Sequence, residues 1–142
     1  MSIGIKRTDL HALAKAKLDD AKLLLANRRY SNAYYLAGYA VELALKATIA
    51  KQIAAETLPD KKMIEETYRG HDLQKLAGIA GLYTEMKSEQ DANPDFAANW
   101  AIVTEWEEKV RYETVDPYTA QTFIQAIDDP THGVLPWIKA RW

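Results

Sequence analysis

Cysteine is absent from the 142 residues of this sequence. Its absence excludes a disulfide framework, a cysteine-ligated zinc site, an iron–sulfur cluster and a cysteine nucleophile. Long apolar runs are also missing: the first ten residues contain none, and no stretch of roughly 18 uncharged apolar residues, the length of a membrane span, occurs in the sequence. We therefore expect a cytoplasmic protein with neither a signal peptide nor a membrane segment.

Glycine and proline are scarce, with 6 and 5 residues respectively, and β-branched runs are almost missing. Hydrophobic residues make up 48% of the chain and charged residues 27%, which is typical of a soluble globular protein and excludes wholesale disorder. The length predicts a single domain over residues 1–142 with one core. The composition predicts an all-α chain.

Apolar residues recur at helical spacing between clear breaks. The second segment is apolar nearly all round, so we expect it to be the central helix, with Gly38 marking the close approach of a neighbour. The fold class that we predict is an antiparallel up-and-down bundle of four to five helices plus a short C-terminal helix. The first helix is expected to begin near Thr8 or Asp9 and to end at Arg28. The other expected helices cover 31–55, a short 61–67, 72–89, 95–111 and 117–127, and the closing segment covers 134–142.

The net charge of −2 conceals an asymmetry along the chain. Residues 1–52 hold nine Lys/Arg and four Asp/Glu, a net of +5, whereas residues 53–142 hold nine and sixteen, a net of −7. A net-acidic chain is a poor general binder of nucleic acid. The first third can still form a local basic face.

Glu42 and Lys46 are the only charged residues between Arg29 and Lys51. Their i, i+4 spacing puts them on one face of the central helix, where they can pair. A half-buried ion pair explains them structurally, and a polar cleft or subunit interface explains them functionally. A charge inside a packed helix needs partners, and the residues alone leave both interpretations open.

Two further residues have a structural and a functional interpretation. His71 opens a helix together with Asp72, either as a cap or as a neutral general base. Arg111 ends a predicted helix, where it either satisfies the last carbonyls or acts as a fork for phosphate. His11, His71 and His132 are far apart in the sequence, and the common catalytic motifs are missing, so we expect no metal site and no cofactor.

Three segments together resemble the HEPN domain family (higher eukaryotes and prokaryotes nucleotide-binding). They are RRYSNAYYLAGYAVELALKATIA, GHDLQKLA and WEEKVRYE, and the resemblance covers about residues 8–142. It implies a bundle of four or five helices that commonly dimerises. Many members are ribonucleases in toxin–antitoxin or antiviral systems, and others accompany a minimal nucleotidyltransferase and bind nucleotides.

Nuclease members of the family carry an arginine followed after four to six residues by a histidine. No arginine in this sequence has a histidine at that distance. Arg111 and Tyr112 instead resemble the subgroup with an Arg-Tyr pair. By resemblance, Glu42, Lys46, His71, Arg111 and Tyr112 form a ligand-binding cleft, in which His71 and Arg111 are the candidate catalytic residues.

Three functions follow as expectations. The first is a nucleotide- or RNA-binding module that acts with a minimal nucleotidyltransferase or in a toxin–antitoxin pair, for which the missing Arg–His motif argues against ribonuclease activity. The second is a divergent ribonuclease toxin, and the third is a non-catalytic protein-interaction module. In each case we expect a homodimer, with the polar cleft near its interface.

Overall fold

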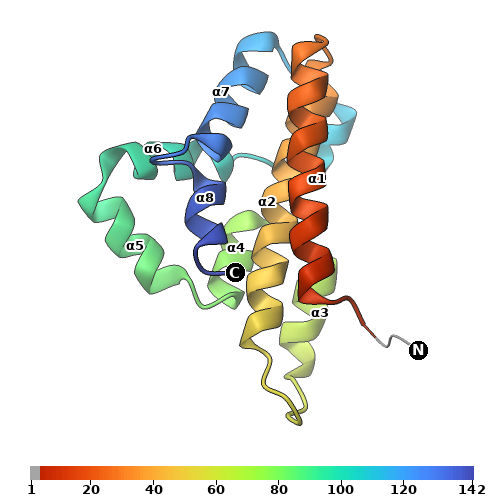
Figure 1. Ribbon diagram of the computed structural model, residues 1–142, viewed down its shortest axis with the longest axis vertical. Coiled ribbons are helices and arrows are strands. Elements are labelled where there is room, and N and C mark those ends of the chain that lie inside the picture. Colours follow the sequence, from red (N-terminus) through yellow and green to blue (C-terminus); the bar gives the residue numbers. More distant parts are fainter. Residues whose placement is uncertain (1–3) are drawn as a thin grey trace.

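The computed structural model describes residues 4–142, whose regular elements are all helices and which contain no strand. The all-α fold class is therefore confirmed. Figure 1 shows the long α1–α2 hairpin beside a second group formed by α5, α6, α7 and α8. The elements are α1 (Arg7–Ala26), α2 (Tyr30–Gln52), α3 (Lys61–Arg69), α4 (Leu73–Ile79), α5 (Tyr83–Ala92), α6 (Pro94–Val103), the 3-10 helix η1 (Glu108–Tyr112), α7 (Pro117–Asp128) and α8 (Val134–Lys139).

The hairpin of α1 and α2 is the best predicted part of the fold. Small side chains let the two helices approach closely, and α2 is also packed against α4, α7, α8 and η1. The expectation that the second helix is central is therefore confirmed. The alanines buried in this hairpin are Ala14, Ala21, Ala33, Ala37, Ala40, Ala44 and Ala47, each with 0% exposure.

The predicted helix starts need correction. Helix α1 begins at Arg7 after Lys6, so neither Thr8 nor Asp9 caps it. Helix α2 begins at Tyr30, and the hydroxyl of Ser31 instead accepts a hydrogen bond from the backbone N–H of Val115 at 2.9 Å. The side chain of Ser31 thus fastens a distant loop to the start of α2.

The single helix predicted over 72–89 is wrong, because the chain forms α4 and α5 with a break between them. Gly81 stands at this break with φ +75°, a left-handed conformation that ends a helix and that glycine adopts without strain. Leu82, which follows, is buried. The turn therefore redirects the chain while its next side chain enters the core.

The helix predicted over 95–111 is also wrong. Helix α6 ends at Val103, Glu107 is extended (φ −136°, ψ 155°), and η1 follows. Trp106 and Val110 are nevertheless buried. Their burial is achieved by a bend and a 3-10 turn rather than by one continuous helix face.

The indole of Trp106 packs against Gly38 of α2 and thereby fixes the bend between α6 and η1. A Cβ at Gly38 would lie 2.2 Å from Nε1 of Trp106, so only glycine leaves room for the indole on α2. Trp106 is 1% exposed, and its Nε1 has no hydrogen-bond partner in the described residues. The predicted close approach at Gly38 is thus confirmed, but the neighbour is a side chain before η1. The contact holds η1 beside the middle of α2.

Buried apolar side chains from all of the longer helices join into one core cluster. Within residues 4–142, none of the helices combines the length and apolarity needed to cross a membrane.

Candidate functional site

A buried carboxylate stands at the centre of the candidate site. Glu42, in the middle of α2, is 1% exposed although it is an acid. Its Oε1 lies 2.8 Å from Nδ1 of His71, and its Oε2 accepts a hydrogen bond from Nζ of Lys46 at 3.2 Å. Both oxygens therefore have partners, which is the condition for keeping a carboxylate in a core.

Local geometry directs His71 toward Glu42. His71 lies between α3 and α4, and the next residue, Asp72, caps α4 by accepting from the backbone N–H of Lys75 at 3.1 Å. On the other side, a Cβ at Gly70 would lie 2.4 Å from the backbone oxygen of Glu66. The cap and this close approach fix the backbone on both sides of His71, so its ring meets α2.

Glu108 of η1 extends the site outward. Its Oε2 lies 3.4 Å from Nε2 of His71, and its Oε1 pairs with the guanidinium of Arg111 at 3.1 Å. The side chain of Glu108 is 41% exposed, so this half of the site is in contact with solvent. Basic and acidic side chains alternate along Lys46, Glu42, His71, Glu108 and Arg111, and we call these five residues the ion-pair network.

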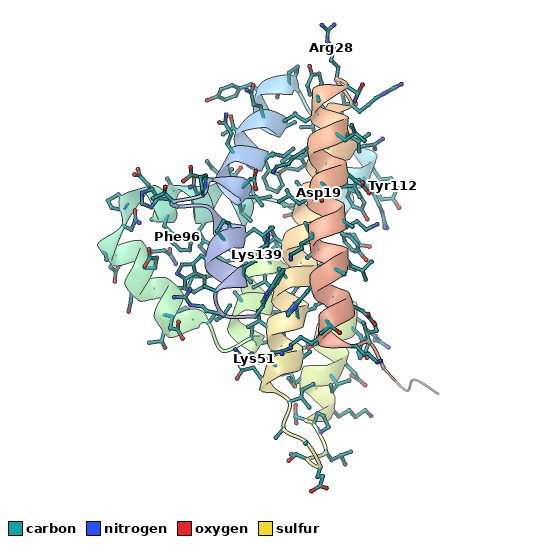
Figure 2. All side chains as sticks on the ribbon, in the orientation of Figure 1. Asp19, Arg28, Lys51, Phe96, Tyr112 and Lys139 are labelled. Carbon is teal, nitrogen blue, oxygen red and sulfur yellow. The ribbon has the colours of Figure 1, made fainter. Side chains whose placement is uncertain are left out.

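Arg111 and Tyr112 form the exposed end of the network. The guanidinium carbon of Arg111 lies 4.9 Å from the ring centroid of Tyr112, within cation–π distance. Hydrogen bonding to Tyr112 is the main cause that raises the pKa of Arg111, so the guanidinium stays charged. Tyr112 is 79% exposed and points away from the helices in Figure 2.

A cavity of about 260 Å³ adjoins the network. Besides His71 it exposes three carboxylates, so its interior repels anions. The lining residues are His71, Asp72, Thr104, Trp106, Glu107 and Glu108. Its chemistry favours hydrogen-bond donors and cations inside the cavity, while Arg111, which pairs with Glu108, offers a positive charge beside it.

A second titratable group lies on the same helix as Glu42. Burial, followed by the charges of Glu42 and Tyr35, raises the pKa of Tyr39. Its phenol therefore remains neutral and packs against the core. Among the described residues, no group of three His, Asp or Glu side chains is arranged to hold a metal ion.

The structure brings the five predicted site residues to one region but not into one cluster. Glu42, Lys46 and His71 are in direct contact, whereas Arg111 reaches them only through Glu108. Within residues 4–142, Arg111 forms no ion pair with Glu42. Asp72 rather than His71 provides the helix cap.

Glu108 was missed by the sequence analysis. The signal for it was present, because Glu108 and Arg111 are spaced i, i+3 and can pair on a helical turn. A regular helix over 95–111 also allows this pair, but it gives no reason for Glu108 to meet His71, and that contact depends on η1.

The family model for the HEPN domain matches residues 9–139. This match covers nearly the whole chain and agrees with the helical fold and the central helix described above. The chain belongs to the HEPN domain family. Searches of the curated proteins and of the solved structures found no match to the chain. Family membership makes this a nucleotide- or RNA-related module.

Proposed function

We propose that the protein binds a nucleotide or RNA at the Arg111–Tyr112 end of the ion-pair network. The observation that carries the proposal is the exposed guanidinium of Arg111 beside the exposed ring of Tyr112, at the outer end of a network whose inner end is the buried carboxylate of Glu42. A guanidinium forms bidentate contacts to phosphate. An exposed tyrosine ring offers a stacking surface for a base.

Charge selects which part of the site a phosphate meets. Asp72, Glu107 and Glu108 line the cavity and repel an anion from its interior. Arg111 lies at the outer edge, with 45% of its side chain exposed. A phosphate therefore approaches Arg111 from solvent and competes with Glu108 for the guanidinium, while the base lies on Tyr112.

The direct test measures binding of fluorescent ATP and of a labelled single-stranded RNA to wild-type protein and to Arg111→Ala. Loss of one phosphate contact lowers affinity about five- to tenfold, and the circular dichroism spectrum stays helical. Lys87→Ala is the control, because Lys87 is an exposed lysine on α5 whose one ion pair among the described residues is with Asp91. Equal affinity of wild type and Arg111→Ala for both probes contradicts the proposal.

A second candidate function is a divergent ribonuclease. A specific contact favours it: buried Glu42 holds Nδ1 of His71, which directs Nε2 toward Glu108, a residue of the cavity lining. Such an oriented histidine is suited to take a proton from a ribose hydroxyl. Cleavage of RNA by wild type and not by His71→Ala would favour this candidate, and intact RNA with both proteins would exclude it.

We further propose a homodimer whose partner is a minimal nucleotidyltransferase or the second member of a toxin–antitoxin pair. The described residues expose large apolar side chains, among them Leu23, Leu58 and Tyr118, and an interface over such side chains would remove them from water. Light scattering on the purified protein tests the dimer, and a 16 kDa particle at micromolar concentration counts against it. Association with a protein and failure to bind any nucleotide would instead indicate the third alternative, a non-catalytic interaction module.

A further inference from the structure

Basic residues from both ends of the sequence gather around Trp142. Arg7, at the start of α1, donates a hydrogen bond to the backbone oxygen of Trp142 at 3.2 Å. Lys51, at the end of α2, donates to the backbone oxygen of Arg141 at 3.2 Å. Nζ of Lys139 lies 5.9 Å from the centroid of the Trp142 ring. The fold thus assembles cations that lie far apart in the sequence.

The positive charge of this surface is largely uncompensated. Of its arginines and lysines, only Arg141 pairs with an acidic side chain, Glu85, at 2.7 Å. Within residues 4–142, Arg7, Lys51 and Lys139 form no ion pair with an acidic side chain. The basic excess of the first third of the sequence therefore has a structural location.

Two cations of this surface, Arg7 and Lys15, act on the imidazole of His11. Burial is the main cause that lowers the pKa of His11, and the charges of Arg7 and Lys15 lower it further, against the raising effect of its contact with the backbone of Trp142. Lys15 lies one helical turn after His11 on α1 and adds a further cation to the same side.

Aromatic rings lie between these cations. The ring of Trp142 stacks on His11 at a centroid distance of 4.1 Å and an angle of 17°. The guanidinium of Arg141 lies 3.6 Å from the centroid of Trp137. Both tryptophans are partly exposed. Planar groups interleaved with cations match the chemistry of a strand with phosphates and unpaired bases.

We propose that this surface, formed by Arg7, Lys15, Lys51, Lys139 and Trp142, binds the backbone of single-stranded nucleic acid. It is separate from the ion-pair network: Lys51 and Lys139 lie to one side of α1 in Figure 2, and Tyr112 lies to the other. An acidic protein surface would use the cations alone, whereas unpaired bases also use the partly exposed ring of Trp142. The inference rests on the proposed function only in sharing its class of ligand.

The test uses labelled twelve-nucleotide oligouridine and oligothymidine with the full chain. The charge-reversal variant Lys51→Glu/Lys139→Glu removes two cations. We therefore expect its affinity for the oligonucleotides to fall about tenfold or more at 0.1 M salt, and the dependence of affinity on salt to become shallower. Lys61→Glu/Lys62→Glu on α3 makes the same change of charge at exposed lysines elsewhere. It is expected to change affinity about twofold at most.

Trp142→Ala and Trp142→Phe test the stacking part. The alanine variant is expected to lose about tenfold in affinity, and the phenylalanine variant keeps most of it, because base stacking needs an aromatic face. Circular dichroism verifies the fold of each variant. Equal binding of both oligonucleotides extends the site to either sugar, and preference for one names it.

Three outcomes overturn the inference. One is unchanged affinity of the folded Lys51→Glu/Lys139→Glu variant, and another is an equal loss with Lys61→Glu/Lys62→Glu. The third is a wild-type protein that binds neither oligonucleotide. If ATP still binds in an Arg111-dependent manner in that case, the proposed function stands and only the second surface is rejected.

Discussion

The two halves of the ion-pair network differ in burial. Glu42 is 1% exposed and contacts His71 at 2.8 Å, whereas Glu108 has 41% of its side chain exposed and lies 3.4 Å from the other nitrogen of the same ring. Contacts in the core are screened little, while those in solvent are screened by water and salt. The inner half is therefore a fixed support, and the outer half is free to exchange partners.

This contrast explains how one site combines stability with ligand exchange. The inner pair keeps His71 in place because an unpartnered buried carboxylate is costly. The outer pair between Glu108 and Arg111 contributes little to stability, since exposed ion pairs are worth about 0–1 kcal/mol. A phosphate can therefore replace Glu108 on Arg111 without disturbing the fold.

The largest expected effect comes from Glu42→Gln. Removing the buried charge leaves Lys46 without its partner and weakens the hold on His71. We expect the free energy of unfolding to fall by about 3 kcal/mol, the lower end for a broken buried pair, because Lys46 and His71 keep some exposure. Urea unfolding followed by circular dichroism measures it. A loss no greater than that of Glu108→Gln would remove the contrast between the halves.

The next effect tests how the outer half is anchored. Gly38→Ala places a Cβ 2.2 Å from Nε1 of Trp106, so the indole that holds η1 must shift. Overpacking of this kind costs about 1–3 kcal/mol, more than the helix propensity that alanine gains. Gly78→Ala on α4 is the matched control, because nothing lies within 4 Å of its Cβ. Thermal unfolding should show a lower Tm for Gly38→Ala and an unchanged or higher Tm for Gly78→Ala.

The smallest effect on stability is expected for Glu108→Gln, which keeps the shape of the side chain and removes its charge. We expect unfolding to change by less than about 0.5 kcal/mol. Affinity for ATP should rise about two- to fivefold, since the competing carboxylate is gone. Titration with fluorescent ATP measures the change. A clear fall in affinity would mean that Glu108 holds Arg111 in its binding position rather than competing for it.

The hairpin was predictable because its pattern is local. Leu10, Ala14, Leu18 and Ala21 of α1 recur at helical spacing and are buried, and Leu25, which continues this spacing, is partly buried. The breaks at Gly81 and after Val103 were not predicted, because apolar residues continue at helical spacing across both. Both breaks depend on features other than apolar spacing. At the first, Gly81 adopts a left-handed conformation, and at the second, Trp106 packs against Gly38.

The candidate site was predictable in composition and only partly in arrangement. Isolation of Glu42 and Lys46 in an apolar helix pointed to a polar partner, and His71 is one. The link to Arg111 depends on the 3-10 turn that presents Glu108, which no helical periodicity reveals. Whether these residues bind a ligand stays a prediction.

In the proposed site a phosphate meets Arg111 while the inner half of the network stays fixed. Titration of the ¹⁵N-labelled protein with ATP, followed by NMR, distinguishes the two halves. We expect large shifts of the Arg111 guanidinium and Tyr112 amide signals, smaller shifts at Glu108 and little change at Glu42. Unmoved Arg111 and Tyr112 signals at saturating ATP, or shifts confined to another face, would contradict it.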